Sequence, residues 1–269
     1  MPTRGEIWFE HLSSGAPRIA GLPPSVLAAD IRLGERAARL LAVVPDPASP
    51  LPRARRGELG LREGWALAAA VREAMQADAD AGHARRALVA LVDVPGQAYG
   101  RREEMLGIHL ACAAAVDAYA DARDHGHPVV ALLVGQAMSG AFLAHGYQAQ
   151  RMIAIDDPGV LVHAMGRDAA ARVTRRSVAE VDELGRANPP MSYRVADYAS
   201  LGLLYRLLGG VDAQAPGAAD VAAVRDALLA ALADIGAGER GLAQRRTGEA
   251  ALRGRAASAQ VRARMAEQW

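Results

Sequence analysis

The sequence predicts an α/β fold with mainly parallel strands, and three observations support this class. Short apolar runs bounded by turn residues alternate with segments of helical periodicity between about residues 38 and 165. Two of these runs, residues 87–92 and 128–134, are apolar throughout, which is typical of parallel strands covered on both faces. After residue 169 only helical patterns follow. Strands separated by helical crossovers pair in parallel, so a parallel sheet followed by helices is expected.

The individual elements follow from these patterns in chain order. Residues 1–29 are expected to form an irregular arm, because Pro17, Pro23 and Pro24 interrupt them. The strands are expected at 38–44, 87–92, 128–134, 151–155 and 160–163. The helices are expected at 63–81, 108–123, 198–208 and 221–234. The basic residues 239–269 predict a solvated helical tail. We therefore divide the chain into an arm (1–29), a main domain (30–210) and a C-terminal helical extension (211–269).

Composition excludes several classes of function. The chain has 269 residues, and half of them are hydrophobic, so a sizeable core is expected. Its single cysteine, Cys112, excludes an intrachain disulfide and is typical of a cytoplasmic protein. It has no apolar run of about 18 residues, so no membrane-spanning helix is expected. All 31 basic residues are arginine, which excludes a Schiff-base or phosphate-loop lysine. The net charge of +1 gives no electrostatic reason to expect nucleic acid as a partner.

One segment of small residues is the leading candidate for a site. The apolar strand 128–134 runs into residues 135–141, Gly-Gln-Ala-Met-Ser-Gly-Ala, which predict a tight turn and the start of a helix. Small residues let a ligand approach the backbone, and unpaired N–H groups at a helix start stabilise an oxyanion. The alternative is a strand-to-helix turn whose small residues serve only packing. A second such segment, residues 93–100, follows the strand 87–92.

Both segments resemble a known family. Residues 91–100, with Glu104 and Gly107-Ile108 after them, resemble the Asp-x-Pro-Gly segment of biotin-linked acyl-CoA carboxyltransferases. Residues 135–141, followed by Met165-Gly166, resemble their Ala-Tyr-Gly-Gly-Ala loop. These enzymes belong to the crotonase-like fold, which Clp-type proteases share. The resemblance thus implies a crotonase/Clp-protease-like spiral of ββα units with additional C-terminal helices.

Within that superfamily the chain resembles most the gamma subunits of biotin-independent malonate decarboxylases, from about residue 30 to 210. This resemblance implies a heterodimer with a beta subunit, decarboxylating a malonyl thioester on an acyl carrier protein. It implies no biotin and no cofactor bound by this chain itself, since the carrier partner bears a coenzyme-A-derived arm, and the residues give no reason to expect a metal. An acyl-transferase alpha subunit is a further partner that it allows. One departure is Ser139, where carboxyltransferases have glycine. A residue other than glycine disfavours positive φ, so the geometry of this turn is expected to differ from theirs.

The implied chemistry assigns roles to the small residues. Loss of CO2 leaves an enolate, whose oxygen the N–H groups of Gly140 and Ala141 are expected to stabilise. Ser139 and His163 complete the expected catalytic set. The expected substrate-binding residues are Gly96, Gln97, Gly100, Gly135 and Met138. The first three of these either hold the departing carboxylate or shape the wall of the site.

Two other classes of function stay open from the sequence. Residues 135–139 also resemble the nucleophile turn of Clp-type serine proteases, with His163 as a base and Asp182 as a weaker third member. The same Ser139 and His163 can instead bind or protonate a substrate without covalent catalysis. The third alternative is a non-catalytic scaffold subunit that docks a partner through the helices 198–208 and 221–234.

Several other polar residues favour structural roles. Asp93 is expected to order the turn before Pro95, and Glu104 to begin a helix. The pair Arg101-Arg102 is read as solvated charge. His125-Gly-His127 lacks a third metal ligand and is read as a loop before a strand, and Cys112 as a core residue.

Overall fold

The chain is built on one mixed β-sheet, as the computed structural model of residues 1–82 and 84–269 shows. Its strand order is β1-β2-β3-β4-β5-β7, and β6 pairs with the far end of β4. Only β1 and β2 are antiparallel; the other described pairs are parallel. The strands are β1 (Val26–Leu33), β2 (Arg36–Val43), β3 (Ala87–Val94), β4 (Val129–Met138), β5 (Arg151–Ile155), β6 (Leu161–His163) and β7 (Arg206–Leu208).

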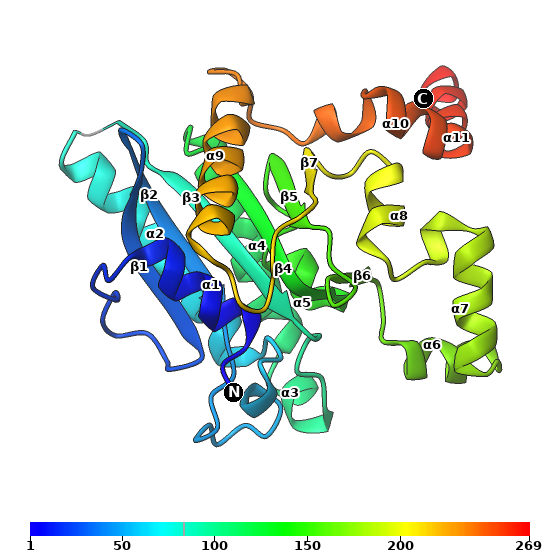
Figure 1. Ribbon diagram of the computed structural model, residues 1–269, viewed down its shortest axis with the longest axis horizontal. Coiled ribbons are helices and arrows are strands. Elements are labelled where there is room, and N and C mark those ends of the chain that lie inside the picture. The colour runs from blue at the N-terminus through cyan, green and yellow to red at the C-terminus, as the bar shows by residue number, and fades with distance from the viewer. Residues whose placement is uncertain (83) are drawn as a thin grey trace.

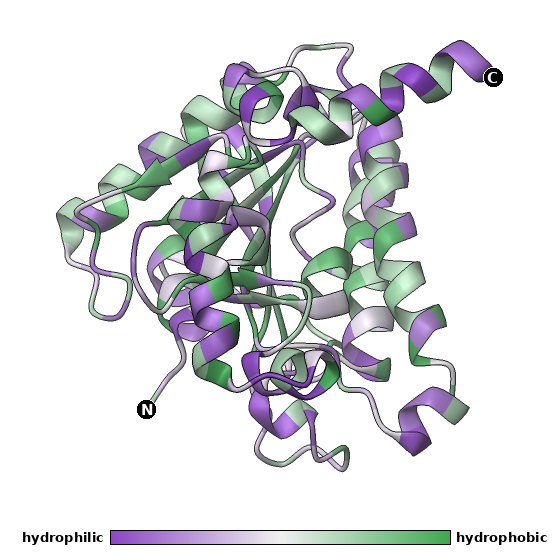
Figure 2. Ribbon diagram, turned by 90° about the vertical axis from the view of Figure 1, so that its right-hand side faces the viewer, coloured by the Kyte–Doolittle hydropathy of each residue, from purple (hydrophilic) through white to green (hydrophobic). Residues whose placement is uncertain are grey.

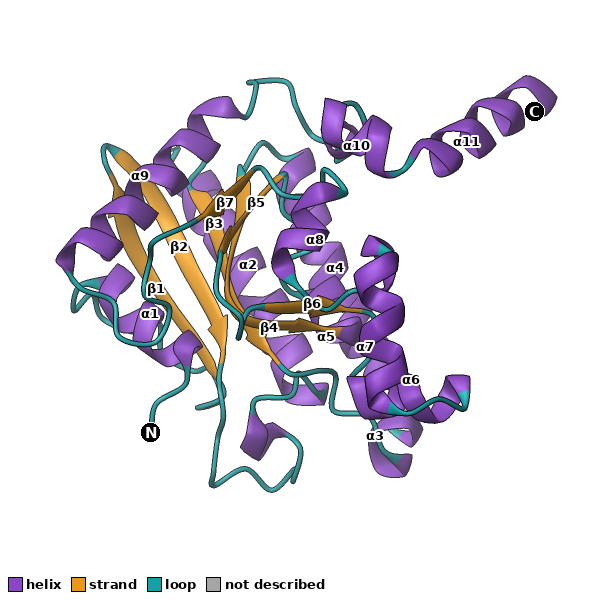
Figure 3. Cartoon of the chain, turned by 45° about the vertical axis from the view of Figure 1, so that its right-hand side comes forward, coloured by secondary structure: helices purple, strands orange, loops and turns teal. Residues whose placement is uncertain are grey.

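Helices cover both faces of this sheet (Figure 1). One face packs against α1 and α9, and the other against α2 and α4. The smaller helices α6, α7 and α8 follow β6, and α11 extends away from the body in Figure 3. The helices are α1 (Arg4–Ser13), α2 (Leu61–Asp80), α3 (Arg101–Met105), α4 (Ile108–Asp124), α5 (Ser139–Ala144), α6 (Arg167–Thr174), α7 (Val178–Ala187), α8 (Val195–Ser200), α9 (Ala218–Asp234), α10 (Glu249–Gly254) and α11 (Ala256–Gln268).

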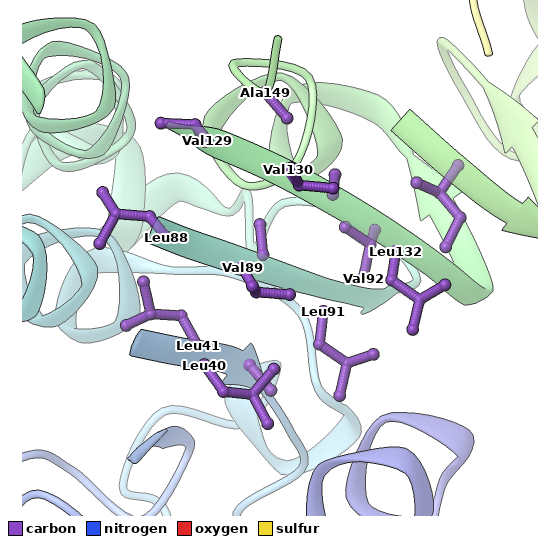
Figure 4. Packing of buried hydrophobic residues seen from close by; sticks show 14 of the residues in the cluster. Leu40, Leu41, Leu88, Val89, Leu91, Val92, Val129, Val130, Leu132 and Ala149 are labelled. Atoms are coloured by element: carbon purple, nitrogen blue, oxygen red, sulfur yellow. The ribbon is translucent and has the colours of Figure 1, made fainter. Parts of the chain in front are cut away.

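The core lies in the central strands, which are mostly hydrophobic along their length (Figure 2). Leu40, Leu88 and Leu132 from three adjacent strands are fully buried, and Figure 4 shows side chains of these strands packed together. Small residues fill the contact between helices α2 and α4. A Cβ on Gly64 of α2 would lie 2.5 Å from the carbonyl oxygen of Ala111 in α4. These two helices therefore cross closely enough that an alanine-rich core fills the space without many aromatic side chains.

The structure confirms the predicted fold class and most of the elements. Strands 87–92 and 151–155 and helices 63–81 and 221–234 were predicted from sequence, and they correspond to β3, β5, α2 and α9. None of the helices in the described part of the chain is both long and apolar enough to span a bilayer.

Two predicted elements are wrong. Residues 1–29 are not irregular, because Thr3 caps α1 and the buried side chains of Trp8 and Phe9 attach that helix to the sheet. The helix predicted over 198–208 ends at Ser200, and Gly202 then adopts a φ of +70°, which favours glycine. The chain continues as β7 beside β5. The division at 29/30 and 210/211 stays a prediction, and the hydrophobic core runs across both points.

His145 links helix α4 to strand β3 within the core, and its burial is expected to make the stability of the fold depend on pH. Its ring is fully buried, with Nδ1 3.0 Å from the Tyr119 hydroxyl and Nε2 3.0 Å from the Leu91 carbonyl oxygen. Burial lowers its pKa from 6.5 to about 4. The unfolded chain therefore binds a proton that the folded chain does not, and stability is lost as the pH falls from 6.5 towards 4. The loss amounts to about 3 kcal/mol at pH 4.

Urea unfolding of the wild type and of His145→Gln between pH 7.5 and 4.5 measures this contribution. We expect the variant to be less stable at pH 7.5 and to lose less stability on acidification. His125→Gln is the control, because the His125 side chain is 60% exposed. Equal pH dependence for wild type and His145→Gln would contradict the role given to this ring.

Candidate active site

The site begins where β4 leaves the main sheet. Val92 and Val94 of β3 pair with Leu133 and Ala137 of β4, so β4 has two extra residues between these pairs. Beyond this irregularity, β4 pairs with β6 instead of β5. The tight turn predicted after residue 134 is therefore wrong, because the strand continues to Met138.

Gly135 and Asp93 make this bend. A Cβ on Gly135 would lie 2.0 Å from Asp93 Oδ1, so only glycine admits the carboxylate beside the backbone. Asp93 accepts hydrogen bonds from the N–H groups of Gln136 and Gly5, both at 3.0 Å. The structure thus gives Asp93 a structural role, tying β3 to β4 and to α1, and it places Gly135 inside the strand.

Ser139 is the first residue of α5 and adopts a φ of +61°. This is the left-handed region that favours glycine and costs another residue about 1 kcal/mol or more. Ser139 therefore keeps the backbone geometry that a glycine would allow. Within the described residues no side chain caps α5, so the N–H groups of Gly140 and Ala141, in its first turn, have no partner within the helix.

A pocket of about 460 Å³ lies against this helix start. Its lining is largely apolar and comes from α5, β6, the turn at residues 189–192 and α8. The lining residues are Ser139, Gly140, Phe142, Leu143, Tyr147, Val162, His163, Ala164, Pro189, Pro190, Met191, Ser192, Tyr198, Leu201 and Leu203. The predicted residues Ser139, Gly140 and His163 thus share one pocket.

Parallel pairing brings His163 beside the helix start. Met138 and His163 are partners in the β4–β6 register, so the residue after Met138 lies next to the end of β6. His163 Nδ1 is 3.0 Å from the Met165 carbonyl oxygen and 3.2 Å from the Met165 N–H nitrogen. Its ring stacks on Tyr193 at 4.0 Å between centroids. Burial, opposed by the Met165 hydrogen bond, lowers the pKa of His163, and the positive charge of Arg167 lowers it further.

The remaining predicted residues are not among those that line the pocket. Gln97 reaches the helix start, because a Cβ on Gly140 would lie 1.8 Å from its Oε1. Gly96 is buried, and its carbonyl oxygen accepts the N–H of Leu59. Gly100 is the N-cap of α3. Met138 packs in a small separate core beneath α6 and α7, so its side chain is placed for packing.

The geometry gives little support to a serine-protease triad. In the described part of the chain no hydrogen bond joins Ser139 to His163, and His163 Nδ1 faces Met165 rather than a carboxylate. Asp182 pairs with Arg167 at 3.0 Å. The proposed third member is therefore engaged elsewhere.

Sequence reasoning missed the group that supports His163. Arg167 lies over the Tyr193 ring, 4.7 Å from its centroid, on the side chain that also stacks with His163. Tyr193 reaches this position because residues 188–193 return to β6 after the α6–α7 hairpin, where the Val162 N–H donates to the Tyr193 carbonyl oxygen. Nothing in the pattern of residues 188–193 indicated contact with His163.

The two loop histidines have separate partners. His125 Nδ1 lies 2.9 Å from the Asp121 carbonyl oxygen, and His127 Nδ1 lies 3.1 Å from that of Arg86. Cys112 is half-buried against the core. Burial raises the pKa of its thiol, with a further contribution from Glu104, so it is protonated at neutral pH.

The sheet with its bend at β4 defines a crotonase-like carboxyltransferase fold. The transcarboxylase 12S chain bound to methylmalonyl-coenzyme A shares it with a TM-score of 0.63 and 22% identity, over 83% of this chain and 40% of that one. The chain belongs to the malonate decarboxylase gamma subunit family, whose model matches residues 54–269.

Solved structures of related proteins cover 99% of the chain. A Pseudomonas malonate decarboxylase hetero-tetramer in complex with coenzyme A contains a chain that is 57% identical, with a TM-score of 0.92 over 99% of this chain and 100% of that one. The Pseudomonas MdcD-MdcE hetero-dimer gives 56% identity and a TM-score of 0.90 over the same shares. Malonyl-S-ACP:biotin-protein carboxyltransferase MADD of Malonomonas rubra is 34% identical over 158 residues, which are 58% of this chain. The chain spans about half the length (54%) of this curated relative.

Proposed function

We propose that this chain is the gamma subunit of a malonate decarboxylase and that it acts with a related beta subunit in the cytoplasm. The complex decarboxylates a malonyl thioester, carried on the coenzyme-A-derived arm of an acyl carrier protein, to an acetyl thioester and CO2. An alpha subunit that transfers the acyl group supplies the malonyl thioester. The observation that carries this proposal is the unpaired start of α5, which opens into a largely apolar pocket beside His163.

The helix start supplies the electrostatic part of catalysis. When the bond between the α-carbon and the carboxyl group breaks, its electron pair passes into the enolate, largely onto the thioester oxygen. The N–H groups of Gly140 and Ala141 stabilise that oxygen more as its charge grows. One such donor contributes about 3 kcal/mol in other oxyanion holes. Ser139 holds the helix start in the required conformation through its positive φ.

The pocket lining supplies the second part. Phe142, Leu143, Val162 and Leu201 surround the space beside the helix start. A carboxylate in such surroundings loses part of its hydration, whereas neutral CO2 does not need it. The apolar wall therefore favours the product of carbon–carbon cleavage over the bound carboxylate. Gln97 reaches the same helix start from the loop after β3, where its Oε1 would lie 1.8 Å from a Cβ on Gly140.

Exposed apolar side chains next to the pocket support a site shared with the partner. Met105 of α3 is 77% exposed, and Leu106, Leu110 and Leu143 are between 52% and 60% exposed. Met105 lies on α3, Leu110 on α4 and Leu143 on α5, and Leu106 lies between α3 and α4. Helix α4 contacts both α3 and α5. Exposed apolar side chains grouped on contacting helices are typical of a protein interface, and Leu143 also lines the pocket. We assign these side chains to the interface with the beta subunit.

Partner-dependent CO2 release is the test of this function. We expect malonyl-thioester decarboxylation by the co-expressed gamma and beta chains and none by the gamma chain alone, because the shared site is incomplete. Release of labelled CO2 from a malonyl thioester of the carrier protein measures it. Met105→Asp on the exposed surface is expected to abolish release by preventing assembly, and Val173→Asp on α6 provides a matched exposed control. Hydrolysis of an activated ester by the lone chain, without CO2 release in the complex, would instead indicate a serine hydrolase.

A further inference from the structure

Decarboxylation leaves an enolate that needs a proton at its α-carbon, and the pocket offers few groups that can deliver one. The side chains with O–H or N–H groups that line it are Ser139, Tyr147, His163, Ser192 and Tyr198. The Ser192 hydroxyl already donates to Asp197 at 2.6 Å, and burial strongly raises the pKa of Tyr198. Imidazole is the side chain in this set that exchanges protons near neutral pH without other activation.

The backbone of Met165 can hydrogen-bond His163 Nδ1 both as an acceptor and as a donor, which suits a ring that gains and loses protons. Its carbonyl oxygen and its N–H nitrogen lie 3.0 and 3.2 Å from the same ring nitrogen, Nδ1. A protonated Nδ1 donates to the carbonyl oxygen, and an unprotonated Nδ1 accepts from the N–H. The ring therefore keeps a hydrogen bond at Nδ1 in every protonation state. Nε2 makes no hydrogen bond to the described residues, so its proton is available to the pocket.

The stack on Tyr193 fixes the ring plane. The His163 and Tyr193 rings are 4.0 Å apart and inclined by 17°, and Arg167 lies over the same Tyr193 ring. A ring packed in this way and bonded at Nδ1 has little freedom to rotate. His163, which lines the pocket that also contains the start of α5, is thus held in one orientation.

We infer that His163 is the proton donor that converts the enolate into the acetyl thioester, an inference that rests on the proposed decarboxylation. The substrate carboxylate favours the protonated ring when it binds, because opposite charges attract. After CO2 leaves, a bond forms between the α-carbon and the Nε2 proton, and the electron pair of the N–H bond stays on Nε2. The neutral ring keeps its Nδ1 proton on the Met165 carbonyl oxygen. Nε2 then takes up a proton from water, which balances the reaction.

The reverse of this step gives a direct test. The assembled complex is incubated with an acetyl thioester of the carrier protein in D2O, and deuterium entering the methyl group is followed by mass spectrometry. We expect the wild-type complex to exchange these hydrogens and His163→Gln to exchange them at least 100-fold more slowly. Glutamine places an amide near the Nε2 position but does not exchange its proton in this way.

His125→Gln provides the matched control, because it makes the same substitution at a histidine whose side chain is 60% exposed and does not line the pocket. We expect wild-type exchange from it. Exchange by His163→Gln at the wild-type rate, with the complex assembled, would overturn the inference, as would absence of exchange in a wild-type complex that releases CO2. A wild-type complex that releases no CO2 from the malonyl thioester would overturn the proposed function itself. A folded but non-exchanging His163→Asn variant, which can still bond Met165, would confirm that Nε2 is required.

Discussion

Gly140→Ala is expected to lower CO2 release by the gamma–beta complex about 100-fold while the chain stays folded. The new methyl group would lie 1.8 Å from Gln97 Oε1, so the end of the Gln97 side chain has to move. Gln97 is flexible, and alanine suits a helix better than glycine, so the free energy of unfolding should change little. The site is less tolerant, because a displacement of about 1 Å costs on the order of 100-fold in rate. Steady-state CO2 release and thermal unfolding measure both effects.

Two further variants separate the contact from a general effect of added bulk. Gly166→Ala adds a methyl group with no atom within 4 Å, and we expect wild-type activity from it. Gly140→Ala combined with Gln97→Ala removes the clashing amide. If the loss acts through Gln97, the double variant should match Gln97→Ala alone, which is strong coupling in a double-mutant cycle. Wild-type CO2 release by Gly140→Ala would show that the enolate binds away from the start of α5.

The sequence was sufficient for the features that depend on local pattern. The run 87–92 is apolar throughout because β3 is covered on both faces, and that property is visible in a short window. Ser139 and His163 lie 24 residues apart in the sequence, yet their placement beside one pocket was predictable. Parallel strands end at the same edge of a sheet, and the Met138–His163 register confirms this placement.

Other features depend on contacts that no short window contains. Residues 198–208 have an apolar pattern that predicts a helix. Pairing with β5 nevertheless makes residues 206–208 a strand, because tertiary contacts override local propensity. Tyr193 reaches His163 only because the α6–α7 hairpin turns the chain back towards β6. The bend of β4 likewise depends on Asp93 beside Gly135, a contact between residues 42 positions apart.

The burial of the N-terminal helix α1 against the sheet is another contact that the local sequence pattern did not predict. The prolines after residue 16 suggested an arm, although Thr3 and Glu6 form a capping box at the start of α1. Three apolar side chains, Trp8, Phe9 and Leu12, lie 0–1% exposed in the core. The Gly5 N–H of the same helix donates to Asp93, so α1 also supports the bend of β4 that leads to the pocket.

Trp8→Ala is therefore expected to destabilise the chain by about 3–5 kcal/mol. The indole is fully buried, and its Nε1 donates to the Ala213 carbonyl oxygen at 2.9 Å, joining α1 to the segment before α9. Truncation loses this packing and leaves a buried carbonyl without its donor. Trp65→Ala on α2 is the matched control, because Trp65 is 52% exposed, and its effect should stay within about 1 kcal/mol. Urea unfolding of both variants gives the comparison; equal stabilities would mean that α1 is a peripheral arm after all, and that Asp93 holds the bend without it.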